Sequence, residues 1–193
     1  MKAKLFMLLI GCLPKNRNVE QHDVYFGIGE NIKEVLAQAM AWWPEAGSSF
    51  HLDAWRAVSY VDGYKVEVTD DKSWQGDMQL YFINLGGYKE NEFEEFHYKM
   101  LVAAAGKNEA VKAAKQTAFF RHTGFKGAPA HIDEKYGVDV DNVYSIRDIL
   151  PDAVKKQYNI ILSPATGLLA EDTIHLGYFR PAKAAEWGRS QDG

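Results

Sequence analysis

The sequence has little cysteine and no long apolar run. Cys12 is the single cysteine in 193 residues, so an internal disulfide is excluded and a reducing compartment is favoured. No stretch approaches the roughly 18 consecutive apolar residues that span a bilayer. We therefore expect a cytoplasmic protein with no membrane partner.

The sequence also has no excess of positive charge. Its 22 Lys and Arg residues are outnumbered by 26 Asp and Glu residues, for a net charge of −4, and the basic residues are scattered. Nucleic-acid binding needs a basic surface that neutralises phosphates, so nucleic acid is not an expected partner. There is no phosphate-cradling glycine loop and no serine nucleophile elbow, and we expect no cofactor.

One short apolar stretch at the N-terminus allows two interpretations. Two lysines precede a run that ends Leu9-Ile10-Gly11-Cys12, which is the pattern of a bacterial lipoprotein cleavage box. The apolar run, residues 5–10, is shorter than the usual signal core of about 7 to 15 residues. A similar stretch, residues 80–87, lies in the middle of the chain, where no signal peptide can be. We interpret both stretches as buried strands that end at a glycine.

A spaced pattern of histidines and carboxylates occurs twice. His22 and His97 are 75 residues apart, and His51 and His131 are 80 apart. The first copy reads Glu20-x-His22, His51-Leu52-Asp53 and Val61-Asp62, and the second reads Glu95-x-His97, His131-Ile132-Asp133 and Val140-Asp141. A repeat of this kind indicates tandem structural units. We expect a first α+β repeat at residues 1–70, a second at 78–150, and a C-terminal extension, 151–193, with a short helix and a last strand.

Each unit is predicted to run strand, strand, helix, strand, strand, which makes the fold class α+β. In the first unit the periodicity predicts strands at 5–10, 19–28, 51–60 and 64–68, with a tight turn at Asp62-Gly63. Asn31 and Glu34 form a capping pattern ahead of an amphipathic helix at 32–43. The second helix, 109–119, is weaker and rich in alanine. Because a unit of this size is marginally stable alone, we expect the two to pack together pseudo-symmetrically.

The repeated pattern supplies the candidate site. Residues i and i+2 of a strand point the same way, so Glu20 pairs with His22, and His51 lies with Asp53 and Trp55 on one side of its strand. If the strands meet near these ends, each unit assembles two histidines and two carboxylates, which could bind zinc, manganese or iron, or place a histidine as a general base. The ligand-binding candidates are Glu20, His22, His51, Asp53, Glu95, His97, His131 and Asp133.

The same residues also have a structural interpretation. Histidines and carboxylates at the rim of a core commonly tie strand ends together by hydrogen bonds. A catalytic set is often degraded in one of two copies, whereas both copies persist here, which favours the structural interpretation. Metal or small-ligand binding and catalysis stay open as alternatives.

These residues resemble the bacterial family known as domain of unknown function 1543, in two tandem copies. The resemblance rests on Leu5 to Gly11, Val19 to Val24, His51 to Trp55 and Val61 to Tyr64 in the first unit. In the second unit it rests on Glu95-x-His97, His131-Ile132-Asp133 and Val140-Asp141. The second unit departs from it at Tyr98, in the place of Asp23, and at Lys135-Tyr136, near the place of Trp55. The resemblance implies small ubiquitin-like (β-grasp) rolls and no established activity.

These inferences lead to a functional expectation with an alternative. We expect a non-enzymatic module that binds a protein or small-molecule partner. The alternative is a metal-dependent hydrolase, or a metal-binding or small-ligand-binding protein, that uses the repeated boxes. A homo-oligomer whose site lies between chains is a further alternative.

Overall fold

The computed structural model describes residues 2–74, 76–117, 143–167 and 170–181, and the backbone of 124–125, 128–129 and 131–132. Within these residues the fold is mixed α+β, as predicted, and every strand pairing is antiparallel. None of the described helices is long and apolar enough to cross a membrane.

The first sheet contains His22, His51 and Asp53, three members of the first box, which is the set Glu20, His22, His51 and Asp53. Its strand order is β13 (His175–Phe179), β3 (His51–Val58), β1 (Lys4–Cys12), β2 (Gln21–Gly29). Helix α1 (Ile32–Trp42) covers its outer face, followed by the 3-10 helix η1 (Pro44–Ser49). The Asn31 side chain caps α1 by accepting from the backbone of Lys33 and Glu34, while Glu34 accepts from the Glu30 amide, so the predicted capping is confirmed.

The second sheet contains Glu95, His97 and His131, three members of the second box, which is the set Glu95, His97, His131 and Asp133. It is built on β6 (Gln79–Tyr88), which pairs with β7 (Glu95–Ala104), β10 (His131–Ile132) and β11 (Val143–Ser145). Helix α2 (Lys107–Ala114) covers its outer face; it begins two residues earlier and ends five residues earlier than predicted. Its buried residues are Ala110 and Ala114, whose small side chains let the helix approach the sheet closely. A two-stranded sheet joins β8 (Gly124–Phe125) to β9 (Ala128–Pro129).

A third sheet and the main core join the other two. The sheet consists of β12 (Asn159–Pro164), β5 (Tyr64–Thr69) and β4 (Tyr60–Val61), next to helices α4 (Ile146–Ile149) and α5 (Asp152–Gln157). The turn between β4 and β5 has positive φ at both Asp62 and Gly63, as the sequence predicted. The main core lies between the first two sheets, where the Phe26 and Phe82 rings pack with centroids 5.3 Å apart.

The C-terminal extension is interleaved with the first unit. Its strand β12 pairs with β5, and its strand β13 pairs with β3. The predicted first unit therefore does not place its four strands in one sheet, because β5 pairs with a strand about 90 residues later and not with β1 to β3.

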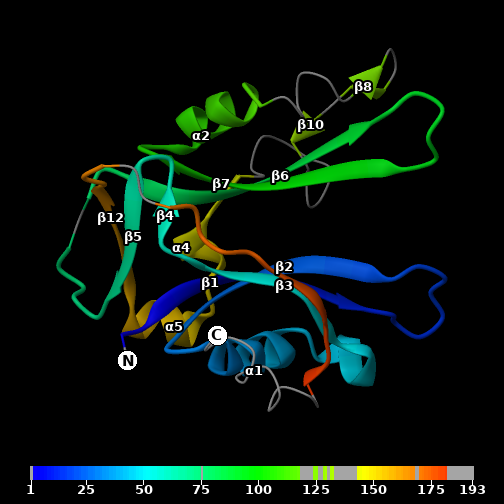
Figure 1. The fold of residues 1–193 in the computed structure, drawn as a ribbon, viewed down its shortest axis with the longest axis horizontal. Helices are drawn as coiled ribbons and strands as arrows, with labels where there is room; N and C mark the ends of the chain where they lie inside the picture. The colour runs from blue at the N-terminus through cyan, green and yellow to red at the C-terminus, as the bar shows by residue number, and fades with distance from the viewer. Residues whose placement is uncertain are drawn as a thin grey trace.

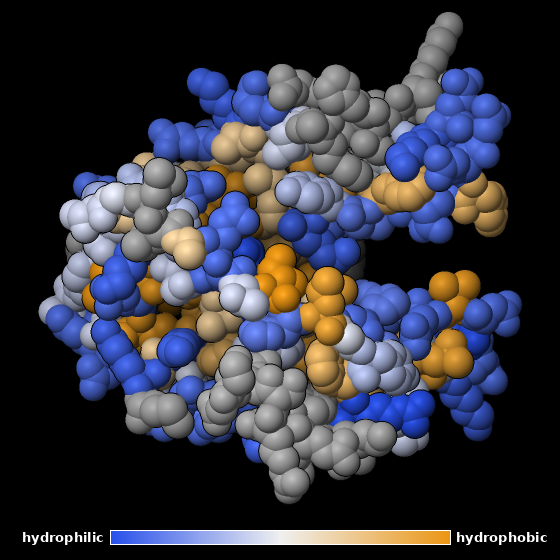
Figure 2. All heavy atoms as spheres, viewed as in Figure 1, coloured by the Kyte–Doolittle hydropathy of each residue, from blue (hydrophilic) through white to orange (hydrophobic). Residues whose placement is uncertain are grey.

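Two arms extend from this core in the same direction (Figure 1). The first arm comprises the ends of β1, β2 and β3 with the loop 13–20, and the second comprises the ends of β6 and β7 with the loop 89–94. Figure 2 shows a notch between the arms that opens to one side of the molecule. The two histidines of the first box lie on the first arm, and Glu95 and His97 of the second box lie on the second arm.

Candidate metal-binding site

The pairing of β1 brings the two histidines of the first box together over a glycine. Strand β1 lies between β2 and β3, and Gly11 is the partner of both His22 and His51. Residues directly opposite each other in adjacent strands project on the same face of a sheet, so the two rings lie side by side above Gly11. A Cβ added at Gly11 would lie 2.4 Å from His51 Nε2 and 2.8 Å from His22 Cδ2. Only glycine fits here.

A register shift in β3 brings Asp53 to the same place. The pairing of β3 with β1 passes from Leu9 and Ala54 directly to Ile10 and Leu52, so Asp53 has no cross-strand partner. The prediction that His51 and Trp55 share a face is wrong for this reason. Trp55 projects to the opposite face, where its ring stacks on His175, while the Asp53 carboxylate stays beside His51.

The four side chains of the first box converge. His22 Nε2 lies 3.1 Å from Asp53 Oδ2 and 3.8 Å from Glu20 Oε2. His51 Nε2 lies 3.5 Å from both Glu20 Oε1 and Asp53 Oδ1. One ligand atom each from Glu20, His22 and His51 lie within 4.8 Å of one another. The sequence expectation that these residues come together is thus met for the first copy.

His51 is the most constrained member of the box. Its side chain is 0% exposed, and its Nδ1 lies 3.0 Å from the backbone oxygen of Ser49. A carbonyl oxygen can only accept, so Nδ1 carries a hydrogen and Nε2 of the neutral ring is left with a lone pair. That lone pair faces two carboxylate oxygens. Among the described residues, His51 Nε2 and Asp53 Oδ2 are both buried without a hydrogen-bond partner.

The surroundings close one side of the box and leave another open. The ring of Tyr178, from β13, stacks on His51 with centroids 4.3 Å apart. Cys12 lies fully buried beneath, and burial, with the nearby charge of Glu20, raises the pKa of its thiol. It therefore packs as an uncharged side chain. Glu20 and His22, with side chains 42% and 39% exposed, face solvent.

The second box has a corresponding backbone arrangement on the other arm. Gly86 of β6 is the partner of both His97 and His131, just as Gly11 is of its two histidines. His97 Nε2 lies 3.9 Å from Glu95 Oε2, and the Tyr88 hydroxyl donates to Glu95 Oε1 at 2.9 Å. The side chain of His131 and all of Asp133 lie outside the described residues.

Three contributors to the first box escaped the sequence analysis. Gly11 was recognised as a strand end only, although its spacing of 75 residues from Gly86 equals that of His22 from His97. The Ser49 carbonyl and the Tyr178 ring carry no sequence signal, since one is backbone and the other comes from a strand more than 120 residues later.

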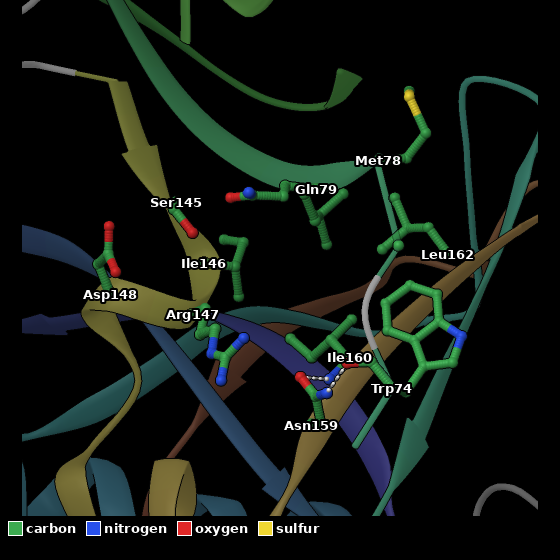
Figure 3. A pocket seen from close by; sticks show the side chains of 12 residues that line it. Trp74, Met78, Gln79, Ser145, Ile146, Arg147, Asp148, Asn159, Ile160 and Leu162 are labelled. Carbon is green, nitrogen blue, oxygen red and sulfur yellow. Dashed lines mark hydrogen bonds between the residues drawn. The ribbon is translucent and has the colours of Figure 1, made fainter. Parts of the chain in front are cut away.

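A separate pocket lies at the junction of the sheets, away from the boxes (Figure 3). It has a volume of about 330 Å³ and is lined by Trp74, Gln79, Ser145 and Arg147 above an apolar floor. The buried Asn159 side chain donates to the Trp74 backbone oxygen at 3.2 Å and accepts from the Ile160 amide. The bond to Trp74 ties β12 to the segment that links β5 to β6.

Comparison with known proteins supports the family resemblance and the fold. The family described as Domain of Unknown Function (DUF1543) matches residues 17–68, which include all four members of the first box. No curated protein matches the chain. The crystal structure of a protein Il1583 from Idiomarina loihiensis is similar over 92% of this chain and 97% of that chain, with a TM-score of 0.54 and 20% identity. At this identity the likeness concerns the fold alone.

Proposed function

We propose that the protein binds a divalent transition metal through Glu20, His22 and His51 and uses that centre to bind a small-molecule ligand. This is the metal-binding and small-ligand-binding alternative of the sequence analysis. Two imidazoles and a carboxylate suit zinc, manganese or iron, and three protein ligands leave a coordination position open. We further propose a cytoplasmic location, which the single cysteine supports.

The observation that carries the proposal is the orphaned Nε2 of His51. The hydrogen bond from Nδ1 to Ser49 is the outer contact that metal-bound histidines usually make, and it turns the Nε2 lone pair towards the carboxylates. In the neutral ring that lone pair faces two carboxylate oxygens at 3.5 Å, which is repulsive unless Nε2 is protonated or a metal ion lies among them, and we propose the metal ion. The purely structural interpretation needs hydrogen bonds instead. His22 Nε2 does lie 3.1 Å from Asp53 Oδ2, but His51 Nε2 makes no hydrogen bond with the described residues.

The three ligand atoms would have to contract around a metal. Ligand atoms about 2.0 to 2.1 Å from a tetrahedral zinc ion stand roughly 3.3 Å apart. One ligand atom from each of Glu20, His22 and His51 lie within 4.8 Å of one another. Glu20 and His22 are exposed and can close around an ion, whereas His51 is held in place.

We also propose that the chain contains two tandem, pseudo-symmetric DUF1543-type units, at 1–70 and 78–150, followed by the extension at 151–193. The equal roles of Gly11 and Gly86 in strand pairing support this. On this proposal Glu95, His97, His131 and Asp133 form a second centre. The two centres would lie on opposite arms of the notch.

Hydrolysis is a second candidate function, and Asp53 is the observation that favours it. Its carboxylate lies beside both histidines but outside the three-ligand set, where it could take a proton from a metal-bound water. Replacement of Asp53 by Asn should then abolish hydrolysis of model esters or phosphoesters while metal binding persists.

Metal binding is tested by measuring the number of metal equivalents bound per chain. Protein purified without a histidine tag or chelator would be analysed for metal content and titrated with zinc and manganese by calorimetry. We expect at least one equivalent, with one equivalent lost in His51→Ala and His22→Ala. His175→Ala serves as the control, because this histidine stacks on Trp55 outside the box. Absence of metal binding, or unchanged binding in both box variants, would refute the proposal.

A further inference from the structure

We infer that the ligand of the metal centre is an elongated organic anion with an apolar body. An oxygen donor at one end would occupy the open coordination position, the body would lie in the cleft between the arms, and a carboxylate at the far end would bind Arg56. This inference rests on the proposed metal centre and adds the chemical class of its ligand.

A cleft of suitable size adjoins the box. It has a volume of about 500 Å³, which is typical of small-molecule sites, and lies between the first sheet and strand β7. Apolar side chains dominate its lining, with two cationic side chains and the carboxylate of Asp62 among them: Leu9, Val24, Arg56, Lys99, Leu101 and Ile174. The lining comes from β1, β2 and β3 on one side and from β7 on the other.

Strand β1 runs from the cleft to the proposed metal ligands. On the inner face of the first sheet, β1 presents Met7, Leu9 and Gly11 in succession, and Gly11 is the residue under the two histidines. Leu9 lies opposite Val24 and Ala54, which give a smooth apolar surface. Four residues of strand separate Met7 from Gly11, a distance of about 14 Å.

The far end of this line carries a guanidinium that lacks an anionic partner. Arg56 lies opposite Met7, and its Nη2 contacts the Met7 sulfur at 3.8 Å, a weak acceptor. No carboxylate among the described residues forms an ion pair with it. Nearby Asp62 and Asp172 instead accept from the backbone amides of Ala103 and Ser59. Arg56 thus keeps its charge and its donors for a ligand.

Strand β13 extends the apolar surface along one side. Ile174 lines the cleft and is 57% exposed, and Leu176, opposite Ala54 and 76% exposed, lies on the same face nearer the box. Tyr178 completes the row by stacking on His51. Exposed apolar side chains in line with a charged group suit a ligand that has an apolar body and a charged end.

The experiment compares three acids: a long diacid, a monoacid of the same length and a short diacid. Zinc-loaded protein would be titrated with decanedioate, with its monoacid counterpart decanoate, and with the short diacid succinate. We expect decanedioate to bind best, because it spans most of the distance between the metal and Arg56. Arg56→Gln should weaken decanedioate binding by about tenfold to a hundredfold, the value of a hydrogen bond to a charged group, and bring it to the level of decanoate.

Arg147→Gln is the matched control, since Arg147 lines the separate pocket of Figure 3. It should leave the preference for decanedioate unchanged. If the zinc-loaded protein binds decanedioate no better than decanoate, or if Arg56→Gln keeps the preference, the inference is wrong while the metal centre stands. If the protein binds no zinc in the same titration, the proposed function fails and the inference fails with it.

Discussion

Replacement of Gly11 by Ala tests the geometry of the box without changing any proposed ligand. The new Cβ would lie 2.4 Å from His51 Nε2, whereas ordinary contact begins at 3.4 Å. The ring must therefore move by about 1.0 Å. It cannot move freely, because His51 is fully buried, bonded to Ser49 and covered by Tyr178.

Two effects should follow from this displacement. Overpacking of this kind costs about 1 to 3 kcal/mol, which for a chain of this length lowers the melting temperature by roughly 2 to 12 °C. Displacement of a ligand ring should weaken zinc binding by about 10- to 100-fold, as loss of an orienting contact does. Thermal unfolding of the metal-free protein measures the first effect and zinc calorimetry the second.

Gly106→Ala is the control for this variant. Gly106 has extended φ, and a Cβ there meets no atom within 4 Å, so the substitution should leave zinc affinity unchanged and cost at most about 1 kcal/mol, because Ala is a poorer helix N-cap than Gly. Wild-type zinc affinity in folded Gly11→Ala protein would show that His51 is not a ligand and would refute the reasoning.

Three further predictions concern the parts of the fold that support the box. Asn31→Ala removes the cap of α1 and should lower the free energy of unfolding by about 1 kcal/mol in denaturant titration; no change would mean that the cap is unimportant. Asp172→Asn weakens the hydrogen bonds from the Ser59 amide and hydroxyl, so the β13 segment should be cleaved faster in limited proteolysis than in wild type. Hydrogen bonds from Lys2 and Lys65 hold the pKa of Glu67 below its usual range, so their stabilisation is present above the pKa of the unfolded carboxyl and is lost as the pH falls through the folded one. Glu67→Gln should therefore be less stable than wild type at neutral pH and equal to it in strong acid; a pH-independent difference would contradict this.

Local signals in the sequence were sufficient to locate most of the elements of the first unit. The run at 5–10, the capping by Asn31 and Glu34, and the Asp62-Gly63 turn depend on neighbours within a few residues, and each is found as predicted. The repeat spacing also identified the residues of the first box. Equal spacing is informative because two copies with strands of equal length, paired in the same way, bring the corresponding residues of each copy together.

Only the tertiary structure decided which way these side chains point and what they contact. The register shift at Asp53, the stacking of Tyr178 on His51 and the pairing of β5 with β12 all depend on partners far away in the chain. Side chains along a strand alternate between the two faces of the sheet, so one unpaired residue moves every later side chain to the other face. The local sequence does not show where such an unpaired residue occurs. The sequence therefore determined which residues make up the box, and the packing of distant strands decided that the lone pair of His51 faces two carboxylates.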